Sequence, residues 1–171
     1  MVSTLAKVRQ LDFVIKAFAV LQRKDPRYKL YFIGDGDEKP HLQELVKKLK
    51  MQDSVIFEGR VPHELMPKYI SCFDIGICHI PDLFVFRQSF PLKILEYLSC
   101  HVPVLASDIP ANREVAKNLK EISLYEFTKD SFITSFFNTH INKTPINQEK
   151  LKNKYDWTVL SKKYLHVYSS F

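Results

Sequence analysis

Glycine is scarce in this chain of 171 residues, which has four, at positions 34, 36, 59 and 76. That number excludes a collagenous or glycine-rich repeat protein and makes each glycine informative. No apolar run approaches the roughly 20 residues that a membrane-spanning helix needs. The start of the chain has no charged segment followed by a short apolar one, so we predict no secretory signal peptide.

Cysteine is rare as well. Cys72, Cys78 and Cys100 form an odd set without C-x-x-C spacing. This pattern argues against a disulfide framework and against a zinc site, and no metal site is expected. The simplest interpretation is three buried or half-buried thiols in a reducing cytoplasm.

The composition describes one folded domain with an excess of positive charge. Hydrophobic residues make up 46% of the chain, which is enough for a packed core and excludes disorder. The 25 basic and 19 acidic residues give a net charge of +6. That charge favours anionic partners such as phosphates or an acidic bilayer, but the lysines are spread along the chain, which favours a merely solubilising surface. Nucleic-acid binding would rest on net charge alone, and we do not predict it.

Strand-like and helix-like segments alternate along the chain. The predicted strands are 28–33, 55–57, 73–80, 102–106 and 121–124, and the predicted helices are 8–23, 38–50, 62–72, 89–100, 112–119, 128–138 and 157–168. Residues 81–89 and 141–150 are expected to be loops. The alternation predicts an α/β fold: a doubly wound, Rossmann-like parallel sheet with helices on both faces. We expect about six strands, the first of which, at 1–5, is short or truncated.

A short glycine motif follows the predicted strand 28–33. In doubly wound sheets, ligands bind beyond the carboxyl ends of the strands, which is where Gly34, Asp35 and Gly36 lie. Two glycines there allow either close approach of the backbone to a ligand or a tight strand-to-helix turn, and both interpretations stay open. The motif is not the G-x-G-x-x-G fingerprint of dinucleotide-binding proteins.

The segment 88–96, QSFPLKILE, opens a predicted helix after a loop. With Ser89 or Phe90 at the cap, the amides of Leu92 and Lys93 are expected to point outward, and a helix N-terminus of this kind attracts anions. Lys93 adds a positive charge. Glu96 lies within an apolar stretch and needs polar partners, for which sugar hydroxyls are suited; an ordinary solvated or paired glutamate is the alternative.

Several motifs together resemble one enzyme family. Segment 88–107 resembles the donor-binding helix and following strand of the family-4 retaining glycosyltransferases of the GT-B type. The order and spacing of the other matches agree with that resemblance: IGDG at 33–36, VIFEGRV at 55–61, PHELMPKY at 62–69, AF at 17–18, YDW at 155–157 and YLHVY at 164–168. The resemblance covers nearly all of the chain and implies that it is the C-terminal, donor-binding half of a GT-B fold.

The resemblance implies roles for the residues around the donor helix. Glu96 matches the second acid of the family's two-glutamate motif and is expected on the donor's ribose hydroxyls. Gln88 stands at the first acid and is expected to bind the transferred sugar without a charge. The family's phosphate-facing amides fall at 91–93, where Pro91 has no N–H. His101 replaces a glycine that often has a positive φ.

Two further roles follow from the resemblance. Arg9 matches the family's lysine beside the diphosphate, whereas Thr4 stands where the family has an arginine. The backbone of Arg60 and Val61 is expected to meet the nucleotide base. The candidate catalytic residues are therefore Gln88, Arg9 and Lys93, and no metal is required, because basic side chains and the helix N-terminus stabilise the departing diphosphate.

The implied activity is transfer of a sugar, with retained configuration, from a nucleoside diphosphate sugar, most readily UDP- or GDP-linked, to a glycan, lipid or other acceptor. The N-terminal acceptor domain is absent, so we expect the isolated domain to be inactive. A cytoplasmic location is expected. Any peripheral contact with a membrane is expected of the full protein. The helix 157–168 is expected to leave apolar residues partly exposed or to form a homodimer.

Two alternatives come from other functional classes. One is a non-catalytic, nucleotide-binding partner subunit or degenerate domain, which Gln88, Thr4 and Pro91 slightly favour. The other is a flavodoxin-like receiver or interaction domain. That class requires an acidic cluster at the ends of the first and third strands, and the sequence has none.

Overall fold

Short parallel strands form the centre of the molecule. The computed structural model describes residues 1–87, 89–117, 119–141 and 145–168. Within them, β1 (Leu30–Ile33) pairs with β2 (Val55–Gly59), and β4 (Val104–Ser107) lies between β3 (Gly76–Cys78) and β5 (Ile122–Tyr125). All three pairings are parallel. The predicted α/β class is confirmed, with five described strands in two sheets where about six were expected in one.

The expected first strand is present only as an extended segment beside β1. Val2 forms an isolated parallel bridge with Ile33. The Ile33 amide donates to the Met1 carbonyl at 2.9 Å, and the Ser3 amide donates to the Ile33 carbonyl at 3.0 Å. These bonds give the segment the direction and place of a strand, as predicted, but it is too short to complete a ladder.

Tyr97 joins the two sheets where the ladder is interrupted. Its hydroxyl accepts from the Val2 amide at 2.7 Å and donates to the Ile77 carbonyl of β3 at 3.4 Å. Its ring lies against Gly76, where a Cβ would stand 2.4 Å from the ring carbon Cγ. A glycine is therefore required at the start of β3 to admit this ring.

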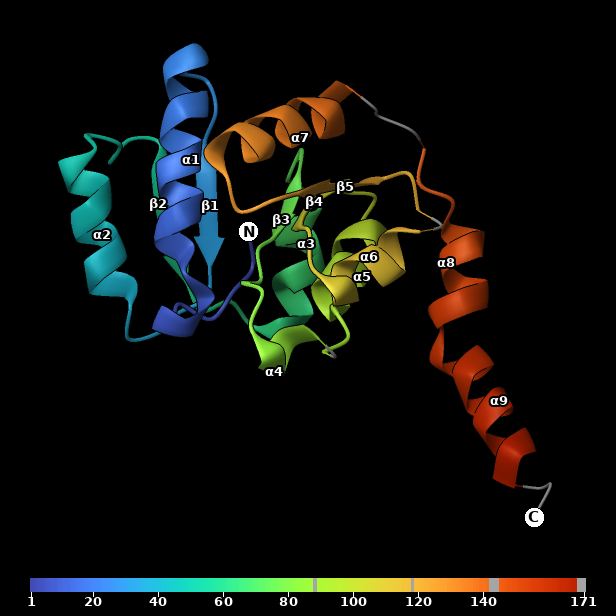
Figure 1. Cartoon of the computed structure of the whole chain (residues 1–171). Coiled ribbons are helices and arrows are strands. Elements are labelled where there is room, and N and C mark those ends of the chain that lie inside the picture. The colour runs from blue at the N-terminus through green and yellow to red at the C-terminus, as the bar shows by residue number, and fades with distance from the viewer. Residues whose placement is uncertain (88, 118, 142–144, 169–171) are drawn as a thin grey trace.

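Helices cover both faces of the strands (Figure 1). They are η1 (Lys7–Arg9), α1 (Leu11–Lys24), α2 (Lys39–Lys48), η2 (His63–Leu65), α3 (Met66–Ile70), α4 (Phe84–Arg87), α5 (Leu92–Ser99), α6 (Pro110–Ala116), α7 (Lys129–Ile141), α8 (Gln148–Tyr155) and α9 (Trp157–Tyr168). Apolar side chains of α1, α2 and α7 form one core, and those of α3, α5, α6 and α8 form a second core on the other face. Such two-sided cover is what a doubly wound sheet requires.

The first predicted helix, 8–23, begins later than expected. Gln10 has a left-handed backbone with φ of 50°, which interrupts the helix between η1 and α1. From Leu11 onward, the apolar face of α1 is buried as its spacing predicts. The break leaves Arg9 on the separate turn η1.

Both predicted loops contain a helix. Within 81–89, the structure has the single turn α4, too short to show a periodic pattern. Within 141–150, α8 begins at Gln148 because the Asn147 side chain caps it, accepting from the Lys150 amide at 2.9 Å. The last predicted helix, 157–168, has the bounds of α9.

Two expectations about exposure have different outcomes. The three thiols were expected to be buried or half-buried, but Cys72 is exposed just after α3.

Helix α9 projects away from the rest of the ribbon (Figure 1), with Leu165 and Trp157 exposed and Val159 and Leu160 half-buried. The side chains of Tyr164 and Tyr168, which belong to the same prediction, lie outside the described residues. The homodimer stays a prediction.

Candidate functional site

The loops that follow the strands meet at the carboxyl edge of the sheets. The Gly34 amide, just after β1, donates to the Gly59 carbonyl at the end of β2 at 2.8 Å. Beyond β3, the Ser107 hydroxyl accepts from the Ile80 amide at 3.0 Å and donates to the Ile80 carbonyl at 2.7 Å. These bonds continue the strand pairing past the strand ends, so the loops start from fixed positions.

The glycine motif packs against the protein's own backbone. A Cβ on Gly34 would stand 2.0 Å from the Ser3 carbonyl oxygen, and one on Gly36 would stand 2.3 Å from that of Leu5. Between them, the Asp35 carbonyl accepts from the Leu5 amide at 3.0 Å. The structure thus supplies a reason for both glycines, namely the close passage of the first extended segment. A direct role for this loop toward a ligand stays a prediction.

Arg9 lies on the turn η1 and is held by an aromatic ring. Its guanidinium carbon is 4.6 Å from the centre of the Phe86 ring on α4, a cation–π contact that joins the first loop to the loop after β3. The side chain is half-buried. This contact places a permanent positive charge between two loops of the carboxyl edge.

Lys93 and Glu96 form an ion pair on the first turns of α5. The Lys93 Nζ donates to Glu96 Oε2 at 2.8 Å, and the two side chains are 44% and 34% exposed. The paired glutamate that was the alternative for Glu96 is therefore present in this conformation. A pair this exposed contributes little to stability and separates readily when a ligand offers better partners.

The buried thiol of Cys78 shows that three predicted site residues converge. Burial raises its pKa to about 12, while the positive charges of Arg9 and Lys93 lower that pKa and the charge of Glu96 raises it. Cys78 is the last residue of β3. Charges from η1 and from α5 thus influence one residue at the carboxyl end of β3.

The start of α5 differs in one respect from the expectation. The Leu92 amide donates to the Phe90 carbonyl at 3.0 Å, so it does not face outward in this conformation. Pro91 has φ of −83° and ψ of 72°, the geometry of a tight turn that makes this bond. The Phe90 and Leu92 side chains are both more than half exposed. Beyond the other end of α5, His101 has φ of 61°, the positive value expected there.

The structure describes two of the three remaining predicted residues. Arg60 is exposed and Val61 half-buried, directly after Gly59, so both lie on the same edge as Arg9 and Glu96. Gln88 lies outside the described residues.

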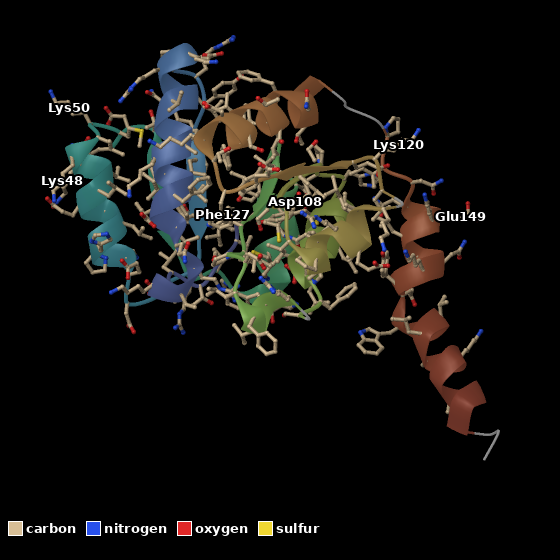
Figure 2. The ribbon with its side chains drawn as sticks, in the orientation of Figure 1. Lys48, Lys50, Asp108, Lys120, Phe127 and Glu149 are labelled. Atoms are coloured by element: carbon tan, nitrogen blue, oxygen red, sulfur yellow. The ribbon has the colours of Figure 1, made fainter. Side chains whose placement is uncertain are left out.

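Two ion pairs fix the loops after β3 and β4. Arg87 on α4 forms a two-point contact with Asp82, whose nearer distance is 2.8 Å. Asp108, labelled in Figure 2, does the same with Arg113 of α6. Both arginines are thus paired with an aspartate close by in the sequence, as Lys93 is paired with Glu96, whereas Arg9 contacts an aromatic ring.

Sequence reasoning missed one buried polar group at this edge. His79 follows β3, is 2% exposed, and lies 2.5 Å from the Tyr125 hydroxyl through Nδ1. Burial lowers its pKa to about 4, so the ring is neutral. An isolated histidine at the end of an apolar strand gives no sequence signal of such a partner 46 residues away.

A cavity in the described part of the chain lies elsewhere. It has a volume of about 670 Å³ and is lined by the turns that precede β1 and β3, together with Phe18 of α1 and Phe132 and Phe136 of α7. These turns lie at the amino ends of the strands, opposite the edge that carries the predicted site residues. We therefore assign it no part in the site.

Metal and membrane features were sought in the described part of the chain. There, no three or more His, Cys, Asp or Glu side chains are grouped in a way that could hold a metal ion. Among the same residues, no helix is both long and apolar enough to cross a bilayer.

Comparison with known families decides the assignment. The family model of the group 1 glycosyl transferases matches residues 1–156. The chain belongs to that family. This match covers both the Arg9 turn and the α5 segment, so the sequence resemblance and the site geometry refer to the same residues.

Curated relatives of this group 1 chain are glycosyltransferases. An uncharacterised glycosyltransferase of Methanocaldococcus jannaschii is 33% identical over 98 residues, which cover 56% of this chain and 22% of that protein. The N-acetyl-alpha-D-glucosaminyl L-malate synthase of Bacillus anthracis is 28% identical over 117 residues, 68% of this chain and 29% of that protein. The chain thus spans less than a third of the length of either relative.

Solved structures confirm the fold. Anabaena HepE in complex with UDP superposes with a TM-score of 0.81 at 19% identity, covering 99% of this chain and 47% of that one. The C-terminal domain of a group 1 family protein of Francisella tularensis gives 0.67 at 20% identity, covering 95% of this chain and 84% of that one. The architecture is therefore the Rossmann-like fold of a GT-B C-terminal domain.

Proposed function

We propose that this chain is the donor-binding domain of a retaining glycosyltransferase that uses a nucleoside diphosphate sugar. The observation that carries the proposal is the match of the group 1 family model to residues 1–156. The charged side chains of the carboxyl edge agree with it: Arg9 is held against Phe86, and Lys93 is paired with Glu96. Two cations and one carboxylate at the carboxyl edge of a doubly wound sheet match a diphosphate and its ribose.

Each charged residue has a distinct role in this proposal. Glu96 accepts hydrogen bonds from the ribose hydroxyls, which requires its pair with Lys93 to open. The released Lys93 and the guanidinium of Arg9 face the diphosphate. The backbone at Arg60 and Val61 meets the base, and the amide of Gln88 binds the transferred sugar.

The chemistry follows from charge. When the bond between the anomeric carbon and the diphosphate breaks, negative charge develops on the leaving oxygen. Arg9 and Lys93 are already in position before the reaction starts, and they stabilise the charge as it develops. They therefore lower the barrier rather than only binding the substrate. The acceptor arrives from a second domain on the face the diphosphate leaves, which retains the configuration. This chain alone is then unable to transfer sugar.

Solved relatives support a UDP-linked donor, and a GDP-linked donor remains the alternative in this proposal. HepE has been solved with UDP and with UDP-glucose. The curated relatives include a mannosyltransferase of Candida albicans and an alpha-monoglucosyldiacylglycerol synthase of Streptococcus pneumoniae, which act on different acceptors. The shared element is the donor half, and the acceptor is left to the rest of the protein.

The test is a calorimetric titration of the chain with UDP, GDP and ADP. Saturable binding of one nucleotide is expected, and Glu96→Ala is expected to weaken it by about tenfold to a hundredfold, the range for lost charged hydrogen bonds. Glu149→Ala is the matched control, because Glu149 lies exposed on α8 (Figure 2). Equal affinities for the wild type and Glu96→Ala would contradict the assignment of the site.

A non-catalytic nucleotide-binding subunit is the second candidate. The observation in its favour is the Leu92 amide, which is already bonded to Phe90 and so does not offer itself to a phosphate. The two candidates differ in turnover. Release of nucleoside diphosphate from the donor by the full-length protein supports the enzyme; tight donor binding without release supports the subunit.

A further inference from the structure

His79 and Tyr125 form a flat, buried pair across the end of β4. Their rings are 5° from parallel, their centres are 6.1 Å apart, and Nδ1 and the hydroxyl oxygen are 2.5 Å apart. Both residues are nearly inaccessible, at 2% and 0% exposure. The pair can span β4 because the residue in register with Tyr125 is the small Ser107. We call these two rings the His79–Tyr125 plate.

The first turn of α1 rests on this plate. Phe13 stacks on His79 at 5.4 Å and 11°, and on Tyr125 at 6.2 Å and 6°. Phe127, labelled in Figure 2 where the chain leaves β5, contacts both rings of this stack, at 4.9 Å from His79 and 5.1 Å from Phe13. Because Phe13 is the third residue of α1, the plate sets the height of the helix start above the strand ends.

The plate also acts on the residue beside Arg9. We assign the Tyr125 hydroxyl as the donor to Nδ1, which leaves the His79 hydrogen on Nε2. That nitrogen is buried without a hydrogen-bond partner among the described residues. The plate is connected to Gln10 through Phe13, whose amide donates to the Gln10 carbonyl at 3.1 Å. Gln10 has the left-handed backbone that separates α1 from η1. A non-glycine residue there carries a conformational cost that its surroundings must offset.

Packing alone does not require a polar plate. Two apolar rings would stack under Phe13 just as well, without the cost of burying an imidazole and a phenol hydroxyl. What a directional bond adds is a single orientation of both rings. The fixed rings in turn restrict the positions of Phe13 and Gln10. Arg9 directly precedes Gln10 in the chain.

We propose that the His79–Tyr125 plate is a positioning element that holds Arg9 at the diphosphate. The plate supports the Arg9 turn from below, while the Phe86 ring supports the guanidinium from the side. Neither His79 nor Tyr125 touches the ligand, since both are buried. The inference rests on the proposed function, because it assigns the geometry of a residue in that same donor site.

The test compares a nucleoside diphosphate with its monophosphate. Titrations use UDP and UMP, or GDP and GMP if the wild type binds guanine nucleotides. Tyr125→Phe keeps the ring and its stacking and removes only the directional bond. We expect it to lower diphosphate affinity by about fivefold, about 1 kcal/mol for one hydrogen bond, and to change monophosphate affinity less than twofold. Arg9→Ala is expected to show the same selectivity with a larger loss.

A thermodynamic cycle separates positioning from general loosening. Adding Tyr125→Phe to Arg9→Ala is expected to cause no further loss of diphosphate affinity, because the plate then has no cation to place. Val46→Ala, in the core under α2, is the control: it destabilises the fold and should leave both affinities unchanged.

The outcomes distinguish the two proposals. Equal losses for both nucleotides, additive losses in the cycle, or an unchanged diphosphate affinity in Tyr125→Phe would overturn the positioning role while leaving the donor site intact. A wild-type chain that binds no nucleoside diphosphate would instead overturn the proposed function, and the positioning role with it.

Discussion

The hydroxyl of Tyr97 accepts a hydrogen bond from the backbone amide of Val2 at 2.7 Å. This bond, together with the one to the Ile77 carbonyl, is where the β1–β2 sheet and the β3–β5 sheet are linked through a side chain. Tyr97 also lies on the same helix as Lys93 and Glu96. One residue of α5 thus fixes the sheets, and its neighbours carry the charges of the site.

Tyr97→Phe tests that linkage. The variant leaves the buried Val2 amide without its partner, so we expect the free energy of unfolding to fall by about 1–3 kcal/mol. Urea unfolding followed by circular dichroism measures it. Tyr69→Phe is the matched control, because the Tyr69 hydroxyl bonds to Glu58 at 3.2 Å in an exposed position. Similar losses for the two variants would show that Tyr97 links nothing essential.

The glycines can be separated by where their missing side chains would fall. Gly36→Ala places a Cβ 2.3 Å from the Leu5 carbonyl oxygen, a backbone atom that cannot move without shifting the first segment. Gly59→Ala meets no atom within 4 Å and carries only the strain of φ of +83°. We expect Gly59→Ala to cost about 1 kcal/mol and Gly36→Ala clearly more, measured as a difference in urea midpoint. Equal urea midpoints for the two variants would mean that the extended segment around Leu5 shifts to admit the added Cβ at little cost.

The Lys93–Glu96 pair should matter for ligand binding and hardly for folding. Its side chains are 44% and 34% exposed, so Glu96→Gln is expected to change the free energy of unfolding by about 0.5 kcal/mol or less. The same variant removes the charged acceptor for the ribose hydroxyls and is expected to weaken nucleotide binding. Thermal shifts with and without UDP report both effects. A large loss of stability without ligand would show that the pair is structural.

Much of the fold was predictable because periodicity records burial. The α9 bounds, 157–168, agree with the structure, and β2 and β5 lie where short apolar runs predicted them. The break at Gln10 was not predictable, since its left-handed backbone depends on contacts with distant residues. The helix α4 has four residues, hardly more than one helical turn, so its residues show no repeating pattern.

The site residues were assigned from their motif positions, and their roles stay predictions. The structure shows Arg9 against the Phe86 ring and Lys93 paired with Glu96. The partner of Glu96 was only one of two open alternatives, because pairing depends on side-chain conformation. The His79–Tyr125 plate was missed altogether. Two residues 46 positions apart meet only because β3 and β5 flank the same strand.

His79 makes the stability of this chain depend on pH in a defined direction. Burial is the largest cause that lowers its pKa, from the ordinary 6.5 to about 4; Gln10 and Asp12 raise it slightly and Arg9 lowers it. The folded state therefore keeps the ring neutral, while the unfolded chain takes up a proton below pH 6.5. Stability is lost as the pH falls from 6.5 toward 4, by about 2 kcal/mol at pH 5, and this group contributes no dependence above pH 7.

The carboxylates of the chain also titrate in that range, so the contribution of His79 must be taken as a difference between two proteins. His79→Phe combined with Tyr125→Phe removes both polar partners and keeps the rings stacked under Phe13, leaving neither an unpaired hydroxyl nor a titrating group. Urea unfolding at pH 7.5, 6, 5 and 4.5 gives the free energy of unfolding as a function of pH for the wild type and for the double variant. The wild type should lose stability relative to the double variant only below pH 6.5. Parallel curves would mean that folding leaves the pKa of His79 unchanged. A wild type that gains stability relative to the double variant as the pH falls would mean that the fold favours the protonated ring, which would also reverse the assignment of Tyr125 as the hydrogen-bond donor in the plate.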